Sequence, residues 1–204
     1  MHISEGILSG GVLIGGALGT AAGVKIGLEK ITDKSLPKVA LLAAGLFVSS
    51  LIHVPVGPIN LHLALTGIAG LLLGWQVFPA LLVVLLLQSI LFQFGGLTTL
   101  GVNVLNLAVP ALICYYLAQL LVDINENNSI WLASVYFLCG SLAIAGSTLL
   151  VAASLALSGK EFLAVAKFAV ISHLPLVIVE GLISSVALVF IKKIKPEMLK
   201  GDLD

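Results

Sequence analysis

Charged side chains are scarce in this chain of 204 residues: 10% are Asp, Glu, Lys or Arg, whereas 59% are hydrophobic. A soluble domain carries about 25% charged residues, so the polar surface here is too small to cover a globule in water. The formal net charge is zero, and the ten basic residues are all lysine. That balance excludes the broad basic face that nucleic-acid binding requires. The composition therefore predicts a protein embedded in a lipid bilayer.

Sequence motifs of common enzymes are absent as well. There is no G-x-x-x-x-G-K-[ST] phosphate-binding loop, so the chain is not expected to hydrolyse ATP by that route. There is no H-E-x-x-H motif and no serine placed as a nucleophile beside a base, so nothing in the sequence indicates an enzyme. Cysteine is rare: Cys114 and Cys139 lie in apolar runs, which favours small buried side chains over a disulfide or a metal pair.

The amino-terminal segment lacks the features of a cleaved leader. No basic residue precedes the first apolar run at Ile7, whereas a secretory signal opens with a positively charged region. Initiator methionine is usually removed only before small residues, and His2 is bulky. We therefore expect Met1 to remain as the mature amino terminus.

Long apolar runs make up most of the chain. A membrane-spanning helix needs about 20 apolar residues, within a range of about 17–25. The candidate runs are Ile7–Gly27, Leu36–His53, Leu61–Leu73, Phe78–Phe94, Leu100–Val122, Ile130–Leu157 and Phe162–Ile191. The prediction is an all-α, polytopic membrane bundle of about seven transmembrane helices, forming a single domain over residues 1–204.

The placement of lysine predicts the orientation, since cytoplasmic loops carry the excess of basic residues. Lysines follow the first run and fill the carboxyl-terminal tail, at Lys25, Lys30, Lys34, Lys38, Lys192, Lys193, Lys195 and Lys200. The opposite side receives only Lys160 and Lys167. We therefore expect the amino terminus outside the cytoplasmic (inner) membrane and the carboxyl terminus in the cytoplasm.

The first two residues form a compact nitrogen chelator. The Met1 α-amine and the His2 backbone nitrogen can close a five-membered ring on a metal ion, and that nitrogen and His2 Nδ1 can close a six-membered ring. One further imidazole would complete a square-planar site, which suits Ni(II), Cu(II) and low-spin Co(II). Taken alone, the same pattern is typical of a frayed terminus with a solvated imidazole.

Further polar residues are expected on the same outer face. His62 follows a Pro- and Gly-rich segment that delays the start of the third run, which would hold its imidazole near the outer surface. Beside the amino-terminal chelator, this position favours His62 as the fourth ligand over a helix-start residue bonded to water. His53 is an alternative ligand, a partner of a ligating histidine, or an interfacial residue. Asn60 and Asn103 could orient the ligating histidines or satisfy helix ends and interhelical hydrogen bonds.

Glycine recurs every four residues in the first run, at Gly11, Gly15, Gly19, Gly23 and Gly27. This spacing leaves one helix face bare and lets another helix approach closely in lipid. We expect the ridge either to pack within the chain's own bundle or, through Gly11, Gly15, Gly19 and Gly23, to dock a partner membrane subunit.

Polar residues inside the later runs are also candidates. His173 and Glu180 are seven residues apart and share a helical face, and ionisable groups within the membrane are functional candidates by default. They are interpreted as a proton relay, a structural pair or a contact to a partner. Gln88 and Gln93 are expected to form interhelical hydrogen bonds.

Several segments together resemble the CbiM/NikM family, the metal-capture (S) subunits of cobalt and nickel energy-coupling-factor transporters. They are Met1–Gly6, Val54–Leu63, Gly95–Asn103, and the ending with His173-Leu174-Pro175, Glu180-Gly181 and Lys195-Pro196-Glu197. Many relatives have a Gly-Thr-Ser-Gly-like stretch where this chain has Pro58-Ile59-Asn60-Leu61, so the hydrogen bonds of that loop are not carried over. The Gly-Pro form is more similar to the cobalt branch.

The resemblance implies a seven-helix subunit whose outward amino terminus folds into the protein and ligates the metal through Met1, His2 and His62. It implies as partners a transmembrane coupling (T) subunit, a pair of cytoplasmic ATPases and a small accessory membrane subunit, which would be a separate chain here. The expected cargo is Co(II), with Ni(II) as the alternative, and no tightly bound organic cofactor is expected. Because ligation needs a neutral amine and neutral imidazoles, capture should weaken as the pH falls.

Two other classes of function remain open at this point. One is a gradient-driven secondary transporter or channel with His173 and Glu180 on the proton path. The other is a membrane scaffold that transports nothing and assembles through the glycine ridge.

Overall fold

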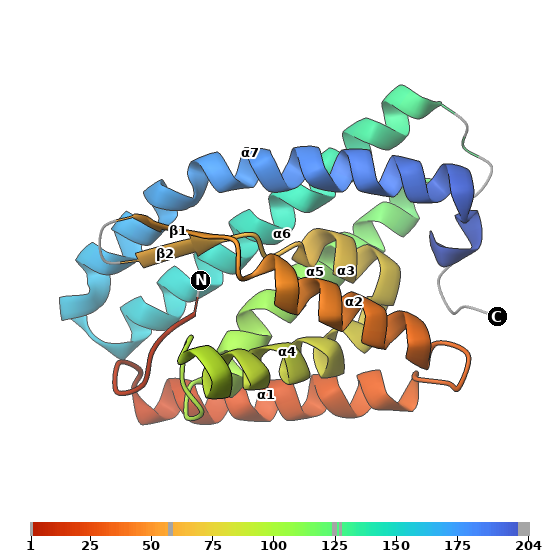
Figure 1. The fold of residues 1–204 in the computed structure, drawn as a ribbon. Helices are drawn as coiled ribbons and strands as arrows, with labels where there is room; N and C mark the ends of the chain where they lie inside the picture. The colour runs from red at the N-terminus through yellow and green to blue at the C-terminus, as the bar shows by residue number, and fades with distance from the viewer. Residues whose placement is uncertain (1, 57–58, 124–125, 127, 200–204) are drawn as a thin grey trace.

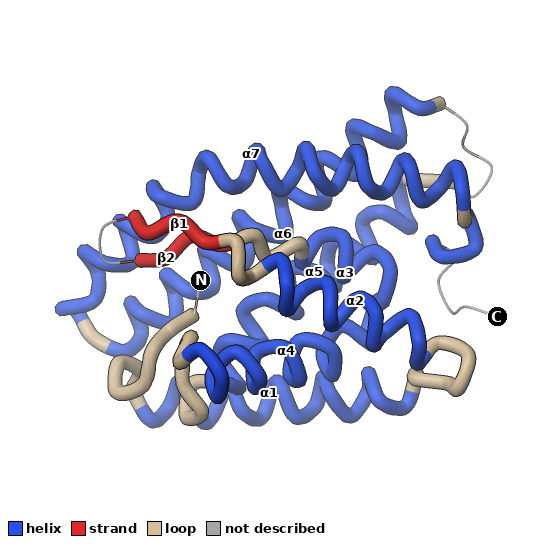
Figure 2. The backbone as a smooth tube through the Cα atoms, viewed as in Figure 1, coloured by secondary structure: helices blue, strands red, loops and turns tan. Residues whose placement is uncertain are grey.

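The computed structural model describes residues 2–56, 59–123, 126 and 128–199, with the backbone alone for residues 53–61. Within them the chain forms seven α-helices, short 3₁₀ helices and one β-hairpin (Figure 1 and Figure 2). The elements are α1 (Gly10–Glu29), α2 (Leu36–Ser49), β1 (His53–Val56), β2 (Ile59–His62), α3 (Thr66–Leu73), η1 (Gly74–Gln76), α4 (Val77–Phe92), α5 (Leu100–Leu121), α6 (Ser129–Ser158), η2 (Lys160–Phe162), α7 (Leu163–Ile194) and η3 (Pro196–Leu199). The predicted helical membrane bundle is confirmed.

The described helices correspond to the seven predicted runs, but not all of them are long enough to cross a bilayer alone. The segments of sufficient length and apolarity are Gly10–Glu29, Thr66–Phe92, Leu100–Leu121, Ser129–Ser158 and Lys160–Ile194. Helix α2 has 14 residues and is shorter than a span. The third and fourth runs join through η1, where Gly74 has a positive φ of 53°.

One predicted helix start is wrong. The third run is predicted to be helical from Leu61, with His62 at its first turn, but these residues belong to β2. Strand β2 pairs antiparallel with β1, so that His53 stands opposite His62. Branched residues on both sides of the Gly57-Pro58 sequence favour extended, paired backbone. Helix α3 begins only at Thr66, after Leu65 in the left-handed conformation (φ 48°).

The elements that the sequence places on opposite sides of the membrane lie at opposite ends of the bundle. Residues 2–9, the hairpin and the turns at 93–99 and 159–162 lie at one end, on the left in Figure 1. The α1–α2 loop and the carboxyl-terminal η3 lie at the other end. The segments that carry His2, His53 and His62 are therefore separated from the lysine-rich segments by the length of the helices.

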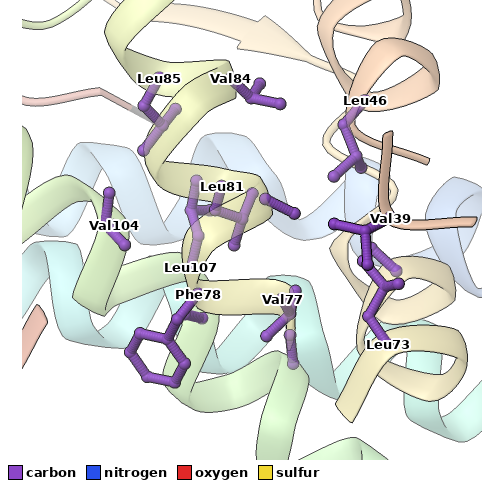
Figure 3. Packing of buried hydrophobic residues seen from close by; sticks show 14 residues of the cluster. Val39, Leu46, Leu73, Val77, Phe78, Leu81, Val84, Leu85, Val104 and Leu107 are labelled. Carbon is purple, nitrogen blue, oxygen red and sulfur yellow. The ribbon is translucent and has the colours of Figure 1, made fainter. Parts of the chain in front are cut away.

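The core that supports this arrangement is formed by α2, α3, α4 and α5. Figure 3 shows Leu81 of α4 between side chains such as Leu46, Val104 and Leu107. Many large apolar side chains face outward, among them Leu120, which is 82% exposed. An outward apolar surface of this kind suits contact with lipid.

The glycine ridge of α1 is divided between two environments. A Cβ on Gly23 would collide with the ring of Phe78, and a Cβ on Gly19 would lie 3.0 Å from Leu105 Cδ1, so both contact the chain's own bundle. At these two positions α1 therefore packs against α5 and α4 of its own bundle, with Gly23 buried and Gly19 partly buried, and partner docking through them stays a prediction. Gly11 and Gly15 have nothing within 4 Å of a Cβ position, and partner docking there stays a prediction.

Candidate metal centre

The amino-terminal segment is docked into the bundle. The Ile3 N–H donates to Asn103 Oδ1 (3.0 Å), and the Ile3 carbonyl accepts from Asn103 Nδ2 (3.1 Å) and Thr99 Oγ1 (2.7 Å). The Ile3 side chain is 4% exposed. The alternative of a frayed terminus is therefore wrong for the chain from His2 onward.

A second contact, made by Glu5, holds the same segment against the 93–99 turn. Glu5 Oε1 accepts from the backbone N–H groups of Leu97 (2.8 Å) and Thr98 (3.3 Å), in the turn that leads into α5. Amide groups just before a helix attract negative charge, since the N-terminal end of the helix dipole is positive. Glu5 thus ties the amino-terminal segment to the 93–99 turn at a point next to the docked Ile3.

Docking brings the imidazoles of His2 and His62 together. The His62 Nε2 atom lies 3.2 Å from His2 Nδ1. The ring centroids are 4.8 Å apart and the planes are inclined by 67°. His62 is 7% exposed, and its Nδ1 atom is buried with no hydrogen-bond partner among the described residues.

A buried amide decides which nitrogen of His2 is available. The His2 Nε2 atom lies 2.6 Å from Gln88 Oε1, and Gln88 Nε2 donates to Ser50 Oγ (2.7 Å). Because the Gln88 oxygen only accepts, His2 Nε2 must carry the hydrogen. The lone pair of neutral His2 is then on Nδ1, the nitrogen that faces His62.

Burial keeps both imidazoles neutral. Loss of hydration lowers the pKa of His2 from 6.5 to about 3. The pKa of His62 is also lowered well below 6.5, first by burial and further by its proximity to His2. Neutral imidazole is the form that binds a metal ion, so the pair is held in its ligating state.

Gly95 leaves the space in which His2 sits. Its φ is +82°, which L-residues with side chains rarely adopt, and a Cβ there would lie 3.3 Å from His2 Cβ and 3.0 Å from Asn103 Nδ2. The glycine of the 93–99 turn therefore permits both the turn and the close approach of the amino-terminal segment.

The remaining predicted site residues are distributed as follows. Met1 lies outside the described residues, as do the side chains of His53 and Asn60, although the backbones of these two belong to the hairpin. Asn103 holds the backbone of Ile3 and so supports the site through the chain rather than through an imidazole. The residue that sequence reasoning undervalued is Gln88, whose only signal is an amide inside an apolar run.

The two polar residues of α7 do not form the structural pair that was one interpretation. His173 Nδ1 contacts the Ala169 carbonyl (2.7 Å), whereas Glu180 accepts from backbone N–H groups at residues 64 and 65. Within the described part of the chain, no hydrogen bond joins the two side chains. Cys114 and Cys139 are buried free thiols, as predicted.

Side chains alone do not make a complete metal site. Among the described residues, no three His, Cys, Asp or Glu side chains gather closely enough to hold an ion. The pair of imidazole nitrogens would need backbone or terminal nitrogens to reach four ligands. An amino-terminal chelate supplies ligands of this kind.

The fold and this site define a class: a multi-pass membrane protein with a buried pair of imidazoles near one end of its helices. The sequence matches, over residues 2–198, the family described as CbiM, the cobalt uptake substrate-specific transmembrane region. The chain belongs to this family, which confirms the resemblance seen in the sequence. It is a multi-pass membrane component of metal transport.

Individual relatives agree with this assignment. The chain is 39% identical over 204 residues to a protein of Haemophilus influenzae named for metal transport, covering 98% of this chain and 97% of that one. It is 39% identical over 115 residues to the fused nickel transport protein NikMN of Rhodobacter capsulatus, covering 53% of this chain and 33% of the relative. A solved transition metal transporter has the same fold, with a TM-score of 0.77 at 24% identity, covering 95% of this chain and 93% of that one.

Proposed function

We propose that the chain is the substrate-binding membrane subunit of an ATP-driven, energy-coupling-factor-type importer, and that it captures Co(II) from the outer side of the membrane. The observation that carries the proposal is the 3.2 Å contact between His2 Nδ1 and His62 Nε2. In that contact Gln88 directs the free lone pair of His2 toward His62.

The separation of the two nitrogens suits adjacent positions around a metal ion. Metal–imidazole bonds are about 2.0–2.1 Å long, so nitrogens at right angles are about 2.9 Å apart and nitrogens on opposite sides about 4.1 Å apart. In the chelate proposed here, His62 stands next to His2 Nδ1 and opposite the His2 backbone nitrogen. The Met1 α-amine would be the fourth ligand, and the metal would replace the hydrogen between the imidazoles.

The choice of metal rests on two comparisons. The family description names cobalt, and the Gly57-Pro58 form of the outer segment favours the cobalt branch. A relative over about half of this chain is named for nickel, which keeps Ni(II) as the alternative cargo. A four-nitrogen site does not itself reject Cu(II), because Cu(II) stands highest in the affinity series.

The proposal includes an orientation and an assembly. The site lies at the end of the bundle opposite the lysine-rich segments (Figure 1), which supports an outward amino terminus. The partners would be a transmembrane coupling subunit, two cytoplasmic ATPases and a small accessory membrane subunit. The exposed Gly11 and Gly15 of α1 are a candidate docking face for one of the membrane partners.

The test is to insert one alanine between Met1 and His2 and to measure metal retained by the purified protein. Insertion moves the imidazole out of the six-membered ring, so we expect bound Co(II) and Ni(II) to be lost. The matched control inserts one alanine between Thr32 and Asp33, in the α1–α2 loop at the other end, and should keep its metal. Equal metal content in both insertion variants would contradict the amino-terminal chelate.

Transport by the chain alone in liposomes would instead support the gradient-driven alternative. That alternative needs Glu180 on a proton path, yet its carboxyl oxygens are occupied by backbone N–H groups. We expect accumulation of metal only when the ATPase partners and ATP are present. A proton gradient that drives uptake by the chain alone would overturn the proposed energy coupling.

A further inference from the structure

The carboxyl group of Glu180 is the most deeply buried acidic group in the described part of the chain, and it has defined partners. The residue is 0% exposed in α7. Its Oε1 accepts from the N–H groups of Ala64 (2.6 Å) and Leu65 (3.0 Å), and its Oε2 accepts from Leu65 (3.0 Å). These contacts join residues more than 100 positions apart in the sequence.

The partners of Glu180 are the backbone donors at the start of α3. Leu65 precedes the first helical residue, and its apolar side chain provides no cap. The N–H groups at the start of a helix need an external acceptor, and a negative group is favoured there by the helix dipole. Both oxygens of Glu180 accept, Oε1 from Ala64 and Leu65 and Oε2 from the shared Leu65 N–H. Glu180 is thus a helix cap supplied from another helix.

The same backbone connects Glu180 to the candidate metal centre. His62 ends β2, and Leu63 alone separates it from Ala64. The connection is held from other sides as well: the Leu63 N–H donates to the Ile52 carbonyl (3.3 Å), and Ser49 Oγ donates to the Leu63 carbonyl (3.3 Å). Leu65 has a left-handed backbone conformation (φ 48°), which is disfavoured for a bulky residue. Contacts to the neighbouring backbone are therefore needed to hold it.

Helices α3, α6 and α7 pack closely around Glu180, so the backbone between His62 and α3 has little freedom to move. A Cβ on Gly67 of α3 would lie 2.7 Å from Gly140 Cα of α6. A Cβ on Gly140 would in turn lie 2.9 Å from the Glu180 carbonyl oxygen. Helices α3, α6 and α7 therefore meet almost backbone to backbone around the carboxylate.

We propose that Glu180 is a positioning residue for metal capture: by capping the backbone at Ala64 and Leu65 it fixes the direction of the His62 imidazole. The position of α7 is thereby linked to the geometry of the metal site. This inference rests on the proposed function, and it adds a role for a residue that touches neither the metal nor an imidazole.

The test compares the purified wild-type protein with E180A, E180Q and N128A. Affinity for Co(II) and Ni(II) is measured by competition with a chelator, and the visible absorption of the bound metal reports its ligand geometry. We expect E180A to bind about tenfold more weakly or worse, in the range of about 10–100-fold seen for residues that orient ligands, and to shift the absorption bands. E180Q keeps one acceptor oxygen, so it should show a smaller change in the same direction.

N128A is the matched control for the loss of a helix cap. Asn128 Oδ1 accepts from the N–H groups of Ile130 and Trp131 at the start of α6, away from the candidate site. The N128A variant should have a lower melting temperature than the wild type, with the same metal affinity and the same absorption spectrum. If E180A fails to fold, E180Q decides the question through the same two measurements.

The outcomes separate this inference from the function on which it rests. A wild type that binds metal, with Glu180 variants of equal affinity and unchanged spectrum, would overturn the inference alone, even if their melting temperatures fall. Equal loss of affinity in N128A would likewise overturn it. A wild type that retains no Co(II) or Ni(II) would overturn the proposed function together with the inference.

Discussion

At the scale of single residues, one amide holds the amino terminus in place. Asn103 donates to and accepts from the same residue, Ile3, in the way a neighbouring β-strand would pair with it. The backbone groups of an extended segment need partners when they are buried, and no strand lies beside this one in the described structure. A side chain from α5 therefore replaces a strand, and it determines where His2 lies.

Replacing Asn103 with alanine should release the amino-terminal segment. The change removes two hydrogen bonds, each contributing about 1 kcal/mol, and leaves buried backbone groups unpaired at about 1–3 kcal/mol. We expect faster hydrogen exchange at the Ile3 amide and weaker binding of metal. The control is N106A on the same helix, where Asn106 contacts Ser154 (3.4 Å) and not the terminus. Unchanged Ile3 exchange in N103A would contradict this role.

The lowered pKa of His2 predicts how docking depends on pH in the metal-free protein. The docked imidazole has a pKa of about 3, whereas the released one has its ordinary value of 6.5. Between these values the released state binds a proton that the docked state does not, so acid favours release. Docking keeps its full stability above about pH 6.5 and loses up to about 1.4 kcal/mol for each pH unit below it.

Exchange of the Ile3 amide, relative to an unfolded chain at the same pH, measures this effect. Protection should be constant at neutral pH and should fall as the solution is acidified toward pH 5 or so. The lowered pKa of His62 acts in the same direction. Protection that stays level across this range would show that the imidazole is not buried in a neutral form.

At the scale of elements, α1 packs so closely against α5 that there is no room for larger side chains at the contact. A Cβ on Gly16 would lie 2.8 Å from Val102 Cα of α5. A Cβ on Gly101 of α5 would lie 2.7 Å from Ala17 Cα. Thr20 Oγ1 donates to the Gly101 carbonyl (2.6 Å) at the same crossing. Small residues let α1 and α5 approach closely, which is the usual basis of helix association in lipid.

Adjacent glycines of α1 should respond differently to alanine. G16A forces α1 away from α5, and overpacking of this kind costs about 1–3 kcal/mol, so we expect a lower melting temperature. G15A adds a methyl group where nothing lies within 4 Å. It should be neutral, or stabilising by up to about 1 kcal/mol through helix propensity. Equal destabilisation by both changes, measured by thermal unfolding in detergent, would contradict the packing of α1 described above.

At the scale of the whole molecule, the two ends of the bundle differ in composition. The end with the hairpin and the amino-terminal segment carries the paired imidazoles. The other end carries the α1–α2 loop and the tail with most of the lysines (Figure 1). A metal ion approaching from the outside would meet the imidazole end if the lysine-rich end faces the cytoplasm.

Cysteine labelling in intact cells can test this orientation. Lys34 and Glu161 are exposed at the two ends, while Cys114 and Cys139 are buried and should not react. A maleimide that does not cross membranes should label E161C in intact cells and K34C only after permeabilisation. The reverse pattern would place the candidate metal centre on the cytoplasmic side and contradict capture from outside.

Much of this protein could be predicted from the sequence, because the relevant properties are local. The length and apolarity of each run decide which segments become membrane helices. The scarcity of charged residues indicates that the surface of the protein faces lipid and not water. The nitrogens of Met1 and His2 are neighbours by covalent connection, so their chelating potential can be read without a fold. Whether Met1 ligates remains a prediction, as it lies outside the described residues.

Only the tertiary structure decided which distant groups meet. Gln88 lies 86 positions from His2, Asn103 lies 100 from Ile3, and Glu180 lies 116 from Ala64. A polar residue inside an apolar run must find a partner, but the sequence does not say which one, since helix packing sets that choice. The same packing decided that the residues up to His62 form β2 and not the start of a helix, because β2 pairs with β1 and Glu180 holds the backbone at Ala64 and Leu65 that follows.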